Sequence, residues 1–373
     1  MFVTMLLGSA AIAGCNREAS NQAATNEAQT ADATPGQILE GYPTAIANSL
    51  DQHRRRLAEA TDRVARGNRS LSSVIRVRQY RWAAGSVVRV AFRGGDPAAY
   101  ARIEQAAQQW TQPGLAHITL SFRDEAGRFR QWTPQDREFA GEIRIGFLND
   151  DANGGYWSLV GLDSIDPTIL GGAAGQQSMN FEGFDGTLPT NWQGTVIHEF
   201  GHALGFEHEH QSPAAACGFR FDDDPGYVHT RDRFGQFIND SRGRRPGLYT
   251  LLGGPPNEWE RAQVDYNLKQ LQASSAYEVG PYDRLSIMEY FFEASMFARG
   301  AQSPCYIDRE SNTLSAQDRI AAARAYPASP ARAQQIEVRT DADTRALART
   351  AVADRALTAS LEARADFRER TSD

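Results

Sequence analysis

The chain has 373 residues, of which 41% are hydrophobic, and its formal net charge is −7. This length allows one large or two modest domains with a substantial core. The negative charge, and the lack of a basic stripe with interleaved aromatic residues, do not favour a nucleic-acid partner.

The first 15 residues predict an export signal. The apolar run Met5-Leu6-Leu7 is too short to cross a bilayer, and Ile12-Ala13-Gly14-Cys15 follows it. The last four residues resemble the lipobox of bacterial lipoproteins, in which the cysteine is lipidated. We therefore expect an outer-membrane lipoprotein, periplasmic or on the cell surface, that contacts the membrane only through a lipid anchor at Cys15. An ordinary signal peptide and a secreted protein are the alternative, because no Lys or Arg precedes the run.

The next two segments lie outside the expected catalytic core. Residues 16–37 carry almost no large apolar side chain and predict a flexible tether. Residues 38–74 predict a helical prosegment or linker, either packed on the domain or removed from it. The apolar positions at helical spacing are Ile46, Leu50, Leu57 and Val64, and Arg54, Arg55 and Arg56 are expected on the opposite side.

The segment from residue 75 to 206 predicts an α/β (α+β) subdomain with a mixed twisted sheet and a helix that carries the site. The periodicity predicts strands at 87–92, 118–122, 142–147, 155–161 and 177–181, and helices at 97–110 and about 190–204. Residues 207–327 are more irregular and form a second subdomain, with helices expected at 257–272 and 314–326.

Residues 198–208 carry the strongest chemical signal. On a helix, His198 and His202 lie one turn apart on the same face, where both can bind one Zn²⁺. Gly205 lets the helix end, and His208 returns as a third ligand. Three protein ligands leave the fourth coordination position open, as in catalytic zinc sites, with Glu199 beside it. The alternative is a structural helix whose buried histidines are satisfied by their neighbours.

A second motif lies at Ser286-Ile287-Met288-Glu289-Tyr290. Together the two motifs resemble those of the metzincin zinc metallopeptidases, in which a methionine turn lies beneath the metal. The turn is most similar to that of the astacin family, apart from Glu289. The resemblance implies a zinc peptidase domain over 75–327, with a cleft between the two subdomains and a protein or peptide as substrate. A matrixin-like peptidase and a catalytically silent surface binding protein are the alternatives.

The resemblance also implies roles for individual residues. Glu199 is the general base, Met288 supports the site, and Tyr290 is a fifth zinc ligand that swings away to stabilise the transition state; a core aromatic is the alternative for Tyr290. Glu209, directly after the third histidine, would bind an N-terminus freshly cut near residues 75–80, and a plain surface carboxylate is its alternative. We find no clear prosegment aspartate or cysteine that would cap the zinc.

Three further expectations concern the periphery of the site. The substrate would add as a strand to an edge formed by Tyr156, Trp157, Ser158 and Leu159, although the aromatic side chains could simply pack. Cys217 and Cys305 could pair in an oxidising compartment or remain free. Residues 328–373 are rich in Ala, Arg and Glu and predict a solvated helical or disordered tail.

Overall fold

The computed structural model describes residues 38, 40–64, 80–149, 154–186, 188–271, 280–289 and 291–371. The predicted export signal and tether lie outside these residues, and so do Cys15 and Tyr290. Within the described residues, no helix combines the length and the apolar composition that crossing a bilayer requires.

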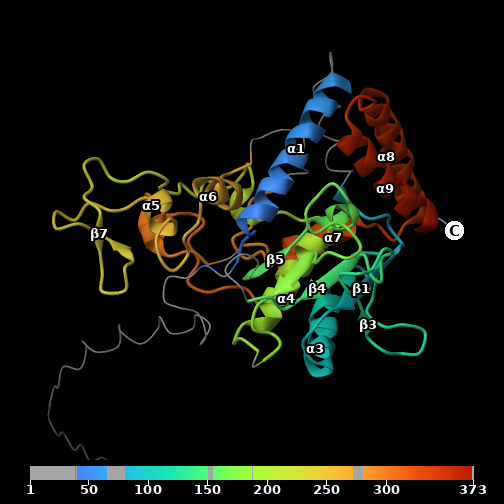
Figure 1. Cartoon of the computed structure of the whole chain (residues 1–373), viewed down its shortest axis with the longest axis horizontal. Coiled ribbons are helices and arrows are strands. Elements are labelled where there is room, and N and C mark those ends of the chain that lie inside the picture. The colour runs from blue at the N-terminus through green and yellow to red at the C-terminus, as the bar shows by residue number, and fades with distance from the viewer. Residues whose placement is uncertain are drawn as a thin grey trace, which may run out of the picture.

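A mixed sheet forms the centre of the described chain (Figure 1). Its strands are β1 (Val87–Phe92), β2 (Thr119–Ser121), β3 (Arg130–Gln131), β4 (Ile143–Gly146), β5 (Tyr156–Ser158) and β6 (Met179–Phe181). The order is β2-β1-β4-β6-β5, with β3 beside β1, and every pair is parallel except β5 with β6. The predicted strands and the mixed α/β fold are therefore confirmed, and β5 is an edge strand.

Helices α3 (Pro97–Ala107) and α4 (Trp192–Ala203) pack together against the sheet. Val196 and Phe200 of α4 lie in the main core with Val88 and Val90 of β1. Two buried tryptophans also hold α4 through its backbone: Trp110 Nε1 donates to Ile197 O and Trp82 Nε1 donates to Ala203 O, both at 2.7 Å. These contacts fix α4 along its length without the help of a ligand.

The chain after residue 207 builds a second core. Helices α5 (Leu248–Leu252) and α6 (Arg261–Leu268) contribute to this core. The same part of the chain also forms β7 (Thr230–Arg231), β8 (Phe237–Ile238) and α7 (Ala316–Ala325), and α7 packs in the main core. Short 3₁₀ helices lie in this part of the chain at η3 (Glu209–Gln211), η4 (Ala294–Met296) and η5 (Gly300–Gln302), and earlier in the chain at η1 (Gln108–Thr111) and η2 (Gly161–Ile165). A disulfide joins Cys217 to Cys305 inside this core. The helix predicted at 257–272 is shorter than expected.

The predicted prosegment helix is α1 (Thr44–Val64), and it packs on the domain. It buries Ile46, Leu50 and Leu57, as the periodicity predicts. The expectation for Arg54 is wrong: its guanidinium lies 2.8 Å from Glu207 and over the ring of Tyr266. Because Glu207 and Tyr266 of other segments lie against this face of α1, they hold Arg54 there rather than in solvent.

Residues 330–371 are largely helical, which is one of the two forms expected for the tail, but the expectation that the tail is solvated is wrong. These residues form α8 (Pro330–Thr350) and α9 (Arg355–Thr371), a hairpin that packs beside α1 (Figure 1). Four of its large apolar side chains are buried, Leu347, Leu357, Leu361 and Phe367, whereas Val338 and Val352 are exposed. The composition misleads because four well-placed apolar residues are enough to bury one face of a two-helix unit.

Candidate metal centre

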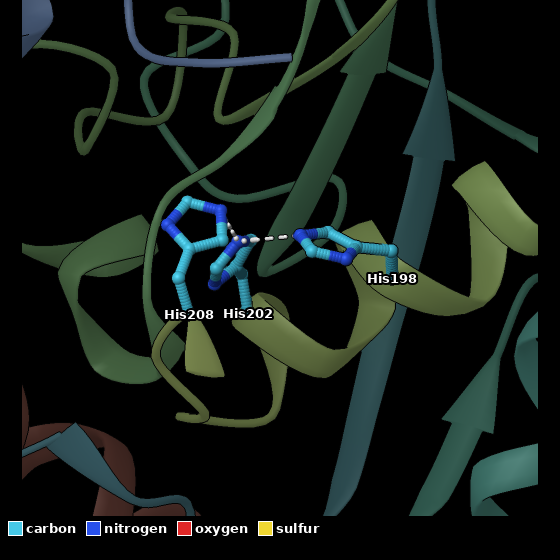
Figure 2. Close-up of side chains that lie close together, drawn as sticks. All are labelled: His198, His202 and His208. Atoms are coloured by element: carbon cyan, nitrogen blue, oxygen red, sulfur yellow. Dashed lines mark hydrogen bonds between the residues drawn. The ribbon is translucent and has the colours of Figure 1, made fainter. Parts of the chain in front are cut away.

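Helix α4 and the turn after it bring three histidines together. His198 and His202 project from the same side of α4, and His208 approaches from the following loop (Figure 2). Between them Gly205 has a φ of 90°, a left-handed conformation that suits glycine at a helix end. Nε2 of His202 lies 3.1 Å from Nε2 of His198 and 3.0 Å from Nε2 of His208.

The other ring nitrogen of each histidine faces an acceptor. The acceptors and their distances from Nδ1 are Ile287 O for His198 (2.7 Å), Phe206 O for His202 (2.8 Å) and Gln211 Oε1 for His208 (3.2 Å). A proton on Nδ1 leaves a lone pair on Nε2, so these contacts turn three lone pairs toward one point. Such an arrangement is stable when a cation lies at that point.

The donor set fits zinc. Two nitrogens bound tetrahedrally to Zn²⁺ at 2.0–2.1 Å are about 3.3 Å apart, close to the separations found here. Burial, and after it the charge of neighbouring histidines, holds the pKa of His202 and His208 well below the usual range. Both rings are therefore in the neutral form that binds metal.

Glu199 lies beside His198, one of the three histidines, and is completely buried. Neither of its carboxylate oxygens accepts a hydrogen bond from a described residue. Burial raises the pKa of this carboxyl well above its usual range, against the opposing effect of His198. An unpartnered buried carboxylate is costly, and a cation with its water at the neighbouring histidines would offset that cost.

The methionine turn lies against the helix at the metal centre. A side-chain carbon at Gly201 would come within 2.3 Å of the sulfur of Met288, so only glycine lets the turn approach α4 this closely. Glu209 is tied to the same turn: its backbone N–H donates to Met288 O at 2.9 Å, and its Oε1 accepts from the N–H of Asp283 at 2.9 Å. Glu209 is therefore not the plain surface carboxylate that was its alternative.

Asp318 supports the turn from α7, a role that the sequence analysis missed. Its carboxylate accepts from Ser286 Oγ at 2.6 Å and from the N–H of Ile287 at 2.9 Å. The same aspartate completes the capping box of α7 with Ser315. The capping pattern identifies the helix start, but nothing in it indicates the second contact, whose partner lies about 30 residues earlier.

Glu40 is the second residue that the sequence analysis missed. Its Oε1 lies 2.7 Å from Nε2 of His198, and the two carboxylates Glu40 and Glu199 form a possible metal group with that histidine. Burial lowers the pKa of His198, but Glu40 outweighs it and raises this pKa to about 9. A lone glutamate before a helix carries no sequence signal for such a role.

The segment around Glu40 covers the edge strand β5. Glu40 and Tyr156 form a parallel bridge, the N–H of Gly41 donates to Tyr156 O at 3.1 Å, and Tyr42 Oη donates to Ser158 O at 2.6 Å. The side chains of Tyr156, Trp157 and Leu159 are buried and pack in the protein. The backbone of the edge strand β5 therefore binds an extended segment of the same chain, residues 40–42.

No family model matches this sequence, and no curated protein matches it. The chain is similar to two solved structures of myroilysin, with 27% identity and a TM-score of 0.49 over 68% of this chain and 98% of that one, and with 26% and 0.41 over 66% and 86%. It is also similar to high choriolytic enzyme 1, a hatching-enzyme zinc protease of the medaka fish Oryzias latipes, with 18% identity and a TM-score of 0.35 over 65% and 92%. All three TM-scores are below 0.5, so we base the function on the geometry of the site.

Proposed function

We propose that this chain is a zinc-dependent endopeptidase of astacin-like type, held latent by its own residues 40–64. The observation that carries the proposal is the convergence of three imidazole Nε2 atoms beside a buried carboxylate that accepts no hydrogen bond from a described residue. A structural histidine cluster would have no use for that carboxylate. Metal-assisted hydrolysis of a peptide bond uses both parts, a Lewis acid and a base.

The chain's own residues would divide the reaction between them. His198, His202 and His208 would hold the zinc, which would act as a Lewis acid for the scissile carbonyl and for water. Glu199 takes the proton of the attacking water and passes it to the leaving amine. The substrate lies extended along β5, through the backbone groups that now contact Gly41 and Tyr42.

Latency follows from where the N-terminal segment lies. Glu40 places a carboxylate at His198, one of the three histidines, and the residues after it occupy the strand edge that a substrate needs. Helix α1 fixes this segment through buried apolar side chains, and α6 fixes it through Asn267, whose Oδ1 accepts from the N–H of Tyr42 at 2.9 Å. A substrate competes with an inhibitor in the same chain, and tethering gives that inhibitor a high effective concentration.

An exported protein accords with the disulfide between Cys217 and Cys305, which persists in oxidising compartments. We retain the lipid anchor at Cys15 as a proposal from the sequence. A cut near residues 75–80 would sever the covalent link between the body of the protein and the inhibitory segment with any anchor on it.

Chelation of zinc tests the activity against the alternative of a silent binding protein. After the inhibitory segment is removed, we expect the protein to cleave casein or gelatin, to lose that cleavage with a zinc chelator, and to regain it when Zn²⁺ is restored. Metal content is measured in parallel. Zinc bound at one ion per chain without any cleavage would favour the binding protein.

Tyr290→Phe tests the astacin-like subtype. If the Tyr290 hydroxyl stabilises the transition state, its removal lowers kcat by about 10²-fold, with little change in KM or zinc content. Tyr306→Phe, a tyrosine of the second core, serves as the control. An unchanged kcat in Tyr290→Phe would favour a matrixin-like centre.

A further inference from the structure

The C-terminal hairpin and the second subdomain hold α1 at its two ends (Figure 1). The first half of α1 packs against the edge-strand region and Tyr266 of α6, through Ile46, Ala47 and Leu50. The second half packs against the hairpin: Leu57 and Ala60 share one buried cluster with Tyr80, Val160, Leu347, Ala351, Leu357 and Leu361. The inhibitory segment thus has contacts far from the metal centre.

A buried ionic cluster joins the hairpin to α1 and to η2. Nη2 of Arg364 on α9 lies 2.7 Å from Asp163 Oδ1 and 2.9 Å from Asp166 Oδ2, both in or next to η2. The same atom lies 3.2 Å from Nε2 of His53 on α1. Burial, and then Arg364, lowers the pKa of His53 to about 3, so His53 is a neutral acceptor.

Because of the way charge is distributed in this cluster, α1 can separate from the hairpin without breaking an ion pair of Arg364. The two aspartates compensate the charge of Arg364 within the body of the protein, whereas His53 contributes a neutral contact. Departure of α1 would therefore leave no uncompensated charge in the hairpin. What α1 would lose is chiefly apolar contact, above all that of Leu57, which is 2% exposed, together with the ion pair between Arg54 and Glu207.

We propose that the α8–α9 hairpin, together with α6, is a docking surface that retains residues 40–64 after the chain has been cut between residues 64 and 80. Cleavage alone then leaves Glu40 at His198, and activation needs a second step in which α1 leaves the hairpin. The proposal rests on the proposed function in treating residues 40–64 as the inhibitory segment of a zinc peptidase.

Retention is tested on the full chain carrying Glu199→Gln, so that no self-digestion occurs. The recognition sequence of a site-specific protease replaces part of residues 65–79, and the chain is cut and immobilised through an N-terminal tag. Release of the body, residues 80–373, is then followed over time. We expect the body to stay bound, and Leu57→Ala in α1 to speed its release on the order of 100-fold.

Two comparisons make the result specific to the hairpin. Leu357→Ala, on the other side of the same cluster, should also speed release, whereas Glu59→Ala on the exposed side of α1 should stay within about twofold of the parent. Thermal unfolding before the cut verifies that each variant is folded, and Leu57→Ala leaves the body unchanged. Release of the parent within the washing time, or equal release from Leu57→Ala and Glu59→Ala, would overturn the proposal.

The readout separates this proposal from the proposed function. Release is measured with the base removed, so it does not depend on catalysis. Failure of the proposed function would instead appear as absence of casein cleavage after the fragment has been removed.

Discussion

The Glu40→Ala variant of the full-length chain is expected to hydrolyse casein about 10- to 100-fold faster than the parent. A charge-assisted contact of a buried carboxylate contributes about 1.5–3 kcal/mol, and its loss raises the fraction of open sites by that factor. The contact in question is the one between Glu40 Oε1 and Nε2 of His198, at 2.7 Å. Helix α1 remains docked, so activation by this change alone is incomplete.

Two further measurements separate relief of inhibition from a general loosening of the protein. A chelator should remove zinc faster from Glu40→Ala, because the carboxylate no longer covers the metal. Glu40→Gln should be intermediate, since the amide keeps the length but not the charge, and Glu59→Ala on the exposed side of α1 should match the parent. Equal activities of Glu40→Ala and Glu59→Ala would exclude Glu40 as the cap.

Glu199→Gln, made in the Glu40→Ala background, is expected to bind zinc normally and to lose activity by about 10²–10⁴-fold. The amide has the size of the carboxylate but cannot accept the proton of the attacking water, and a positioned general base contributes a factor of this order. The histidine contacts through Nδ1 do not involve residue 199, so the metal ligands keep their orientation.

The measurements are kcat, zinc per chain by elemental analysis, and thermal stability. The exposed Glu138 provides the matched control, because Glu138→Gln makes the same chemical change at the surface. Activity of Glu199→Gln within tenfold of its parent would remove Glu199 as the base. Loss of zinc would place this residue among the groups that hold the metal.

The sequence predicts the centre of the site well because its parts are local. His198 and His202 are related by one helical turn, and Gly205 supplies the left-handed residue that brings His208 back within six residues. The strand at 87–92 and the capped helix beginning after Ser315 are equally local patterns, and both agree with the structure. The pairing of Cys217 with Cys305 is not local, and the sequence leaves it open.

The sequence by itself determined which atoms can gather a metal, because short-range spacing on one helix and one turn decides that. The tertiary structure alone decided what covers those atoms and what holds the cover in place. Glu40 meets His198 across a long stretch of chain, Arg364 finds Asp163 and Asp166 from the other terminus, and Asp318 reaches the methionine turn from α7. In each case the partner belongs to a distant segment, and neither hydrophobic periodicity nor residue spacing records which distant segments pack together.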